Sequence, residues 1–266
     1  MSNRRAWLAL WLDAPLQSWG FESRFERRHT GMFPTKSGVL GLICAAMGAP
    51  KGSDREREVL TAFANPGMVA VRFPRRFVTR CNPDKWEDRR VRRLTDYHTI
   101  GNTRTADNPK PRKDQTVQSW RDYLMDARFV VLLPGEQPVL EQAADKLLDP
   151  VWGVWLGRKA CVPSAPVLVT DEARSTFDSP EAAWQAALRL AQALDEQHAH
   201  TVSKPWTAFT HVRDDVSFAE GTDTWNDAPQ SFGRADSSGV EGRQFSPRRV
   251  KVVPPSAIHN PQPAID

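Results

Sequence analysis

Three features of the 266-residue sequence predict an α+β fold. The chain opens with an apolar run that fits a buried strand, capped helices then alternate with apolar strands, and a long charged segment interrupts the alternation. The composition, with 40% hydrophobic and 26% charged residues, is typical of a soluble globular protein. The longest nearly uncharged apolar run, residues 38–50, is shorter than the roughly 20 residues of a membrane-spanning helix. We therefore expect no membrane contact and a cytoplasmic location.

The first half of the chain alternates strand and helix patterns. Strands are predicted at residues 6–12, 68–73 and 127–133, and helices at about 36–47, from the capping box at Ser53 to about 65, and at 138–148. Glycines and alanines recur on successive turns of the first helix, which lets it lie close to a sheet. This order approximates the βαββαβ plan of ferredoxin-like and RRM-like folds.

The remaining segments are predicted to add a smaller, β-rich C-terminal part to this body. Residues 116–125 are predicted as a short helix, 180–196 as a long helix capped by Ser179, 215–247 as a polar stretch, and 248–253 as a short strand. We divide the chain into an RRM-like domain at 1–148, a C-terminal part at 149–253 and a disordered tail at 254–266.

Basic charge is concentrated in the charged segment. Between Arg72 and Arg128 the sequence has fifteen lysines and arginines against eight acidic residues, a net charge of +7, whereas the whole chain has +4. The stretch 74–114 has little apolar periodicity, so it cannot form core, and aromatic residues are interleaved with its cations. Cations replace counterions on phosphates and aromatic rings stack on bases, so the pattern is typical of binding to single-stranded nucleic acid. A solvated loop explains the same composition equally well.

Few residues fit catalytic or metal chemistry. Cys44, Cys81 and Cys161 lie too far apart to form a CxxC pair, which predicts a reducing compartment and no structural zinc. The histidines have no metal-ligand spacing. His98, beside Tyr97, has the chemistry of a general base for cleavage at an RNA 2′-hydroxyl, but the pattern favours a histidine that donates one hydrogen bond to RNA or to a loop carbonyl. We expect no metal, no cofactor and no catalytic residue.

Short motifs are spread over most of the chain. They are Ala14–Gly20, Phe33–Leu42, Asp96–Thr99, Thr116–Ala127, Leu156–Cys161, Phe232–Arg234 and Phe245–Arg248. In this order they resemble the motifs of the CasD family of CRISPR Cascade subunits, most of all its type I-E branch. The resemblance extends over about residues 6–250.

This resemblance implies an RRM-like body with a projecting β-hairpin thumb, which would be the basic segment from about 75 to 115. It implies a noncatalytic subunit that binds the 5′ handle of CRISPR RNA (crRNA) and caps the backbone filament of the complex. The implied partners are the crRNA 5′ handle, the Cascade backbone subunit and the large subunit that reads the PAM. Target DNA near the PAM is a further expected partner.

The residues predicted to bind RNA are mostly polar or cationic. They are Gln17, Trp19, Arg24, Lys36, Ser37, Gly38, Arg89, Arg90, Arg92, Arg93, Tyr97, His98, Arg104, Arg112, Arg121 and Arg158. At a helix start, Lys36 would place a charge beside unpaired amides, which suits a phosphate, although the same residues also fit a plain helix cap. The alternative function, found in the type I-C branch of the family, is a metal-independent endoribonuclease that processes precursor crRNA, with His98, Tyr97 and Lys36 as its active groups.

Overall fold

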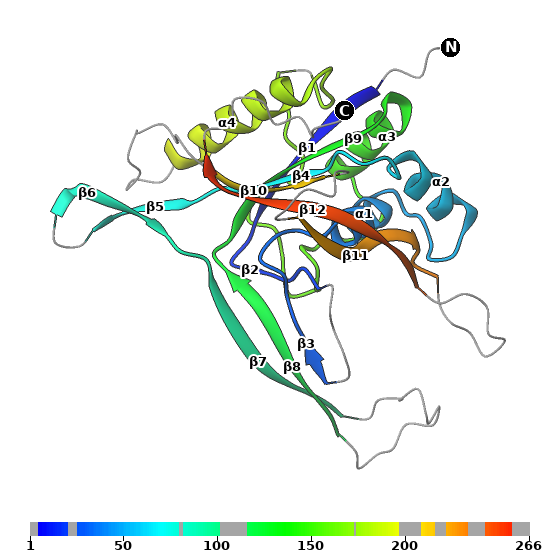
Figure 1. Ribbon diagram of the computed structural model, residues 1–266, viewed down its shortest axis with the longest axis horizontal. Helices are drawn as coiled ribbons and strands as arrows, with labels where there is room; N and C mark the ends of the chain where they lie inside the picture. Colours follow the sequence, from blue (N-terminus) through cyan, green and yellow to red (C-terminus); the bar gives the residue numbers. More distant parts are fainter. Residues whose placement is uncertain are drawn as a thin grey trace.

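The computed structural model describes residues 5–20, 26–79, 82–101, 116–172, 174–196, 209–215, 222–233 and 243–256. The helices are α1 (Lys36–Ala46), α2 (Asp54–Ala62), α3 (Gln137–Leu148) and α4 (Pro180–Glu196). The strands are β1 (Arg5–Asp13), β2 (Leu16–Gln17), β3 (Arg27–Arg28), β4 (Val69–Arg72), β5 (Arg75–Thr79), β6 (Asn82–Arg89), β7 (Arg92–Gly101), β8 (Thr116–Met125), β9 (Arg128–Glu136), β10 (Phe209–Asp214), β11 (Thr222–Ser231) and β12 (Gln244–Ser256). Figure 1 shows their arrangement.

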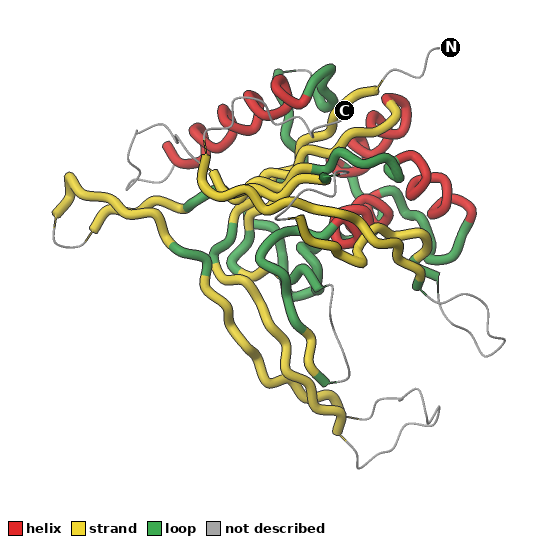
Figure 2. Tube along the Cα trace, in the orientation of Figure 1, coloured by secondary structure: helices red, strands yellow, loops and turns green. Residues whose placement is uncertain are grey.

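A six-stranded antiparallel sheet forms the body, with strand order β1-β9-β4-β10-β12-β11. Helices α1, α2 and α3 lie on one face of this sheet and α4 lies on the other (Figures 1 and 2). Successive β1 side chains point to opposite faces. Leu8 and Leu10 therefore join the core beneath α1–α3, whereas Trp7 and Trp11 join the core beneath α4. The prediction that this apolar run is a buried strand is confirmed.

An irregular segment covers the outer edge of β1. Trp7 and Phe177 exchange backbone hydrogen bonds of 2.7 and 2.9 Å, and Trp11 N donates to Val167 O at 2.7 Å. An uncovered strand edge would expose a row of unpaired amides and carbonyls. These bonds place the irregular segment after Pro150 against the first sheet.

Two projections leave the body (Figure 1). β5 and β6 pair as one hairpin, and β7 and β8 pair over ten residues, from Arg92↔Met125 to Gly101↔Thr116. β3 pairs with the other edge of β8. We call β3, β7 and β8 together the ribbon. The basic segment predicted as a single thumb at 75–115 therefore contains the β5–β6 hairpin and strand β7, and its residues 102–115 lie outside the described part of the chain.

The prediction of a helix at 116–125 is wrong, because these residues form strand β8. The segment includes Thr116, Val117, Trp120 and Tyr123, which are β-branched or aromatic residues that favour strands. Its hydrogen-bonding partners lie about 25 residues earlier in β7 and earlier still in β2 and β3. Such pairing decides the outcome for a short segment of mixed propensity, and it is not visible in the local sequence.

The polar stretch 215–247 includes strand β11 and the start of β12, which complete the six-stranded sheet. The strand predicted at 248–253 is confirmed as part of β12, which continues to Ser256 and so passes the expected start of the tail. Residues 257–266 lie outside the described part of the chain. Since β4 pairs with β10, the two predicted parts of the chain share one sheet.

The predicted helices at about 36–47, 54–65, 138–148 and 180–196 agree closely with α1 to α4. At the start of α2, Ser53 Oγ accepts a hydrogen bond from Glu56 N at 3.2 Å, as the capping box predicts. Glu56 returns the contact one residue earlier than expected, since its Oε2 accepts from Gly52 N at 3.0 Å.

Candidate nucleic-acid interface

The turn after β1 is fixed by two fully buried side chains, Gln17 and Trp19. Gln17 Nε2 donates to Leu12 O at 3.0 Å and to Ala127 O at 2.6 Å, and Gln17 Oε1 accepts from Trp19 Nε1 at 3.0 Å. A buried amide with all its partners in the protein has nothing left to offer a ligand. We therefore correct the expectation that these two residues contact RNA: they shape the turn.

Two glycines allow other segments to approach this turn closely. Gly157 has φ +103°, and a Cβ there would lie 1.8 Å from Ser18 O. Ser18 N donates to Leu156 O at 3.0 Å across the same contact. A Cβ on Gly38 would lie 2.8 Å from the Trp19 ring. Segment 156–157 and helix α1 thus both lie directly on the turn, and Gly38 serves packing rather than an anion.

Arg158 follows this close contact and joins the body to the ribbon. Its Nη1 donates to Asp122 O and its Nη2 to Arg28 O, both at 2.8 Å. Its guanidinium carbon lies 4.7 Å from the centroid of the Tyr123 ring. These contacts hold β8 and β3 at a fixed distance from the loop that carries Arg158.

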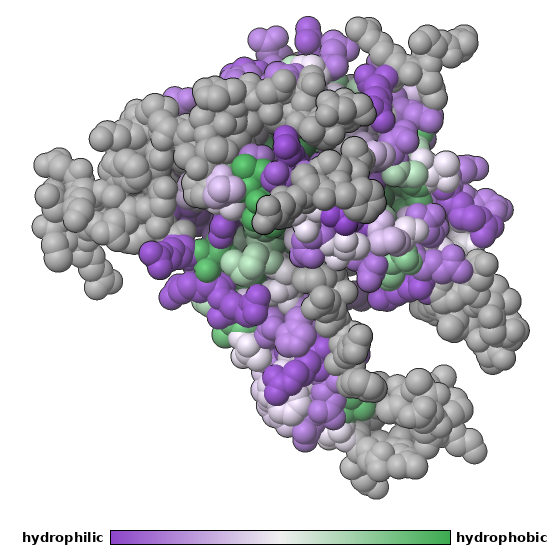
Figure 3. Space-filling model, in the orientation of Figure 1, coloured by the Kyte–Doolittle hydropathy of each residue, from purple (hydrophilic) through white to green (hydrophobic). Residues whose placement is uncertain are grey.

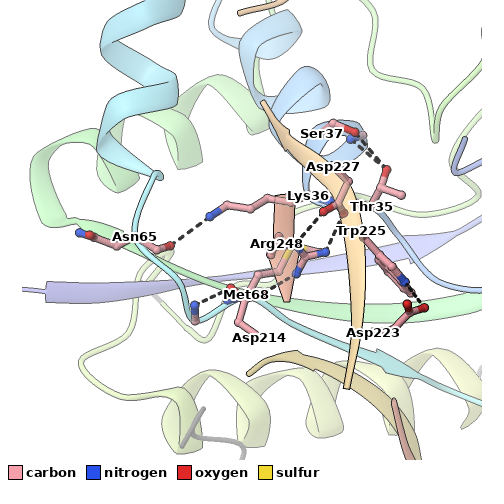
Figure 4. A network of polar contacts seen from close by, with 12 residues as sticks. Thr35, Lys36, Ser37, Asn65, Met68, Asp214, Asp223, Trp225, Asp227 and Arg248 are labelled. Carbon is pink, nitrogen blue, oxygen red and sulfur yellow. Dashed lines mark hydrogen bonds and ion pairs between the residues drawn. The ribbon is translucent and has the colours of Figure 1, made fainter. Parts of the chain in front are cut away.

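Lys36 is 2% exposed, which does not agree with the predicted phosphate contact. Its Nζ donates to Ala64 O at 3.3 Å and Asn65 O at 3.0 Å, and its backbone N donates to Asp227 Oδ2 at 2.8 Å (Figure 4). Burial lowers the pKa of Lys36, although the nearby carboxylates oppose this effect. The side chain fixes the start of α1 to the loop after α2.

A buried arginine continues the same network into the C-terminal strands (Figure 4). Arg248 donates to Asp227 from Nε at 2.8 Å and from Nη2 at 2.7 Å, and it forms an ion pair with Asp214. Asp214 Oδ2 accepts from Gly67 N at 2.6 Å and Met68 N at 3.0 Å. Burial opposes the charge of Arg248, but the two carboxylates outweigh burial and raise its pKa. This junction ties β10, β11 and β12 to the loop before β4.

The ribbon presents an exposed row of aromatic and cationic groups. Cross-strand partners share a face of a sheet, and the register pairs Tyr97 with Trp120 and Trp120 with Arg27. The Tyr97 and Trp120 ring centroids are 5.5 Å apart, and the Arg27 guanidinium carbon lies 5.6 Å from the Trp120 ring centroid. Tyr97 is 53% exposed. We call these three residues the stacking row.

A second row lies beside the stacking row on the same face. Asp122 accepts from Thr95 Oγ1 at 2.7 Å and lies 2.9 Å from His29 Nδ1. Burial raises the pKa of Asp122, but the hydrogen bonds from His29 and Thr95 and the charge of Arg93 outweigh it, so the pKa is lowered. Arg93 also donates to Thr30 O at 3.3 Å. The carboxylate on β8 therefore orients Thr95 of β7 and His29, the residue that follows β3.

Further arginines surround this face, and hydrophilic side chains cover much of the described surface of the ribbon (Figure 3). Arg90 and Arg92 are exposed where β7 leaves the body, and Arg92 lies 3.8 Å from Asp126. Arg121 lies on the opposite face, where Asp96 is its cross-strand partner. The ribbon thus has cations on both faces and at its base.

The structure brings only some of the predicted RNA-binding residues together. Arg90, Arg92, Arg93, Tyr97, His98, Arg121 and Arg158 lie on or beside the ribbon, whereas Gln17, Trp19, Lys36 and Gly38 lie in the body as described above. Ser37 is partly buried, and its Oγ lies 3.4 Å from Thr35 Oγ1. Arg24, Arg104, Arg112 and the side chain of Arg89 lie outside the described residues.

The three groups of the alternative nuclease site do not meet. Tyr97 and His98 are consecutive in a strand, so their side chains point to opposite faces of the ribbon. The Lys36 ammonium group is bound to two backbone carbonyls inside the body. This arrangement does not bring the three groups of the alternative site together.

Sequence reasoning missed four residues of the interface: Arg27, His29, Trp120 and Asp122. Arg27 lies in the two-residue strand β3 and His29 directly follows it, and so short a strand has no periodic signal of its own. Trp120 and Asp122 lie in a segment rich in β-branched and aromatic residues, and this composition was the available signal for a strand.

Among the described residues, no group of three or more His, Cys, Asp or Glu side chains is arranged to bind a metal ion. The described helices include none that is long and apolar enough to cross a membrane.

Comparison with known proteins gives a family match over most of the chain. The profile of the family described as CRISPR-associated protein (Cas_Cas5) matches residues 7–251. The chain belongs to this Cas5 family. It is 33% identical over 170 residues to the CRISPR system Cascade subunit CasD of Escherichia coli (strain K12). The matched region covers 62% of this chain and 70% of CasD.

Two solved structures are similar over most of the Cas5 chain. One belongs to a CRISPR RNA-guided surveillance complex, with a TM-score of 0.61 and 26% identity, covering 94% of this chain and 90% of the other. The second is described as the crystal structure of a Cas protein, with a TM-score of 0.54 and 25% identity, covering 93% and 95%. The α+β fold with antiparallel sheets is therefore common to this chain and other Cas proteins.

Proposed function

We propose that this Cas5 chain is a noncatalytic subunit of a Cascade-type CRISPR complex and that its ribbon binds the 5′ handle of crRNA. The stacking row of Tyr97, Trp120 and Arg27 carries this proposal. It places two aromatic rings and a guanidinium in line across three strands, on a surface that projects from the body.

The chemistry of the row suits a single RNA strand. Aromatic faces stack on unpaired bases, and arginine both stacks on a base and neutralises a phosphate. A duplex hides its base faces, whereas a single-stranded end can present bases to side chains. A 5′ handle is such an end. Arg93 lies on the same face of β7 as Tyr97, and Arg90 and Arg92 lie at the base of this strand, so the three cations can neutralise its phosphates.

The other face of the ribbon suits a protein partner. Leu94, Ile100 and Val117 lie on this face by register and are 39%, 39% and 38% exposed. We propose contact with the backbone subunit here, with the large PAM-reading subunit and nearby target DNA as further partners. The names of the similar proteins, a Cascade subunit and a surveillance complex, support a role for this chain within a multi-subunit complex. The body would then be a modified RRM-like domain. Its adjacent strands β1, β9 and β4 would correspond to strands of the RRM sheet.

The proposal is tested by incubating the purified chain with labelled cognate repeat RNA in EDTA across a salt series. Retention of intact RNA that weakens as salt rises is the expected result, because phosphate binding releases counterions. Cleavage of the repeat to a fixed 5′-handle product would contradict a noncatalytic role. Absence of any RNA binding would contradict the proposal as a whole.

A further inference from the structure

The outer edge of β7 is an unpaired strand edge. The ribbon has the strand order β7-β8-β3, so β8 pairs with only one edge of β7 (Figure 1). Among the residues that the structure describes, no backbone group pairs with the other edge. All ten residues of β7 are exposed or half-buried, so solvent reaches this strand along its whole length. An open strand edge is a template for pairing with another chain.

A hydrogen bond on the other side of β8 shows which backbone groups of β7 face outwards. Trp120 N donates to Glu26 O at 2.9 Å, so the backbone groups of Trp120 point away from β7. Trp120 and its cross-strand partner Tyr97 therefore form a pair without hydrogen bonds, in which the backbone groups of both residues point away from each other. Successive residues of a strand alternate in this respect. The residues whose N–H and C=O groups face the outer edge are thus Arg93, Thr95, Tyr97 and Thr99.

This edge lacks the features that protect the two edges of the six-stranded sheet. That sheet ends in β1, which segment 167–177 covers, and in β11, where Pro229 has no N–H group and two register shifts interrupt the pairing with β12. β7 has no proline and no lysine, and its ten pairs with β8 contain no register shift. Proline, lysine and bulges are the usual means of preventing pairing at an edge. A long regular edge without them indicates that another strand covers it.

The outward groups suit a peptide strand better than RNA. Each outward-facing residue presents one donor and one acceptor, which an extended peptide matches group for group. The phosphate oxygens of RNA accept hydrogen bonds but do not donate them, so they would repel the outward carbonyl oxygens. The pattern of the edge therefore favours protein over RNA.

Charge disfavours a second copy of the same chain. The described part of the ribbon has more arginines than acidic residues. The arginines are Arg27, Arg28, Arg92, Arg93 and Arg121, and the acidic residues are Asp96 and Asp122. Two such ribbons placed edge to edge would repel each other, whereas an acidic segment would be attracted.

The side chains of β7 define the chemistry of the partner strand. Arg92 and Arg93 are exposed at the end of the strand near the body, where acidic cross-strand neighbours would be favourable. Leu94 and Ile100 are each 39% exposed on one face, where apolar neighbours would cover them.

We propose that an extended segment of another protein subunit pairs with the outer edge of β7 and adds a strand to the ribbon. This segment carries acidic residues at the end near Arg92 and Arg93, and apolar residues beside Leu94 and Ile100. The inference rests on the proposed function, because it assumes that the chain works in an assembly of several subunits. RNA then lies on the stacking row, and the partner strand lies along the edge of β7.

Hydrogen exchange of single amides, measured by mass spectrometry, tests this proposal. The full chain is compared in three states: alone, with repeat RNA, and in the complex assembled from all its subunits and repeat RNA. We expect the amides of Thr95, Tyr97 and Thr99 to exchange more slowly in the complex than in the other two states. The intervening amides already face β8 and serve as the internal control.

A proline substitution tests the backbone contact itself. Thr99→Pro removes one outward N–H group and keeps the bonds with β8, because proline is tolerated where the N–H group of an edge strand faces solvent. Thr99→Ala is the matched control, since it loses the same hydroxyl group and keeps the N–H group. In competition with wild type for incorporation into the complex, Thr99→Pro should be disfavoured by about 2- to 12-fold, the usual value of one hydrogen bond, and Thr99→Ala should not be. Unchanged RNA binding by isolated Thr99→Pro shows that its ribbon is folded, and the exchange measurement on wild type keeps the test valid if it is not.

The outcomes separate this inference from the proposed function. Equal exchange of the outward amides in the complex and in the RNA-bound chain would overturn the inference and leave the proposed function standing. Slower exchange with RNA alone, or with rising concentration of the chain alone, would also overturn it, because RNA or a second copy would then occupy the edge. Failure of the wild-type chain to bind RNA or to enter a complex would instead overturn the proposed function.

Discussion

Arg248 and the arginines of the ribbon carry the same guanidinium group in very different surroundings. Arg248 is 7% exposed and forms ion pairs with two buried carboxylates. These carboxylates neutralise its charge, and the ion pairs join the C-terminal strands to the body. Arg27 and Arg92 are exposed, and Arg27 lies over an aromatic ring. The difference teaches that basic composition alone does not identify an RNA-binding surface. What matters is whether the charges still face outwards once the protein contacts are made.

The largest expected effect on stability is that of a substitution at Arg248. Arg248→Ala should lower the free energy of unfolding by about 3–5 kcal/mol, because it leaves Asp214 and Asp227 buried without their partner. Urea unfolding measures this loss. Arg189→Ala is the control, since its ion pair with Asp171 is exposed and should contribute no more than about 1 kcal/mol. Equal effects of the two substitutions would show that the junction is not the stabilising element we describe.

Gly157→Ala tests the close contact between segment 156–157 and the turn after β1. Gly157 has φ +103°, and the added Cβ would meet Ser18 O at 1.8 Å, so the segment must move. We expect a loss of about 1–3 kcal/mol from backbone strain alone, with weaker RNA binding as Arg158 is displaced. The control is Gly101→Ala on the ribbon, where a Cβ meets nothing within 4 Å. A Gly157→Ala protein as stable as the Gly101→Ala protein would contradict the contact.

The two faces of the ribbon are distinguished by Tyr97 and Leu94. Tyr97→Ala should weaken RNA binding by about 1–3 kcal/mol, because a stacked base loses its ring. Leu94→Ala removes a 39% exposed side chain from the other face and should leave RNA affinity unchanged. Anisotropy titrations of both variants measure the contrast. Similar losses in the two variants would remove the distinction between an RNA face and a protein face.

The charge of the ribbon can be measured separately from stacking. Arg90→Ala and Arg93→Ala should each weaken RNA binding and reduce the slope of log affinity against log salt by about 1, because one phosphate contact is lost. Arg189→Ala, on α4, should not alter the slope. Unchanged slopes in the ribbon variants would mean that the phosphates lie elsewhere.

The smallest expected effect is a pH dependence at Asp122. The pKa of Asp122 is lower in the folded protein than in the unfolded chain, because contacts with His29, Thr95 and Arg93 outweigh the effect of burial. Its stabilising contribution should be complete above the unfolded pKa of about 3.9 and should be lost as the pH falls through the folded pKa. Urea unfolding of wild type and Asp122→Asn from pH 6 to pH 3 tests this. A stability difference that does not narrow towards low pH would contradict the assignment.

Much of the body was predictable from local sequence. The apolar β1 run, the capping box at Ser53 and the amphipathic α4 each specify their own structure. The ribbon was not predictable from local sequence, because β8 is a strand only through its pairing with β7 and β3. The site was predicted in part for the same reason. Tyr97 is exposed on β7, but no local pattern shows that Lys36 turns inwards to two carbonyls or that Arg27 lies beside Trp120.

The most direct test of the central claim is ultraviolet crosslinking of the full chain to labelled single-stranded repeat RNA, followed by mass spectrometry of the crosslinked peptides. We predict adducts on Tyr97 or Trp120, the aromatic members of the stacking row, and their loss as salt releases the RNA. Adducts confined to peptides outside the ribbon would contradict the account.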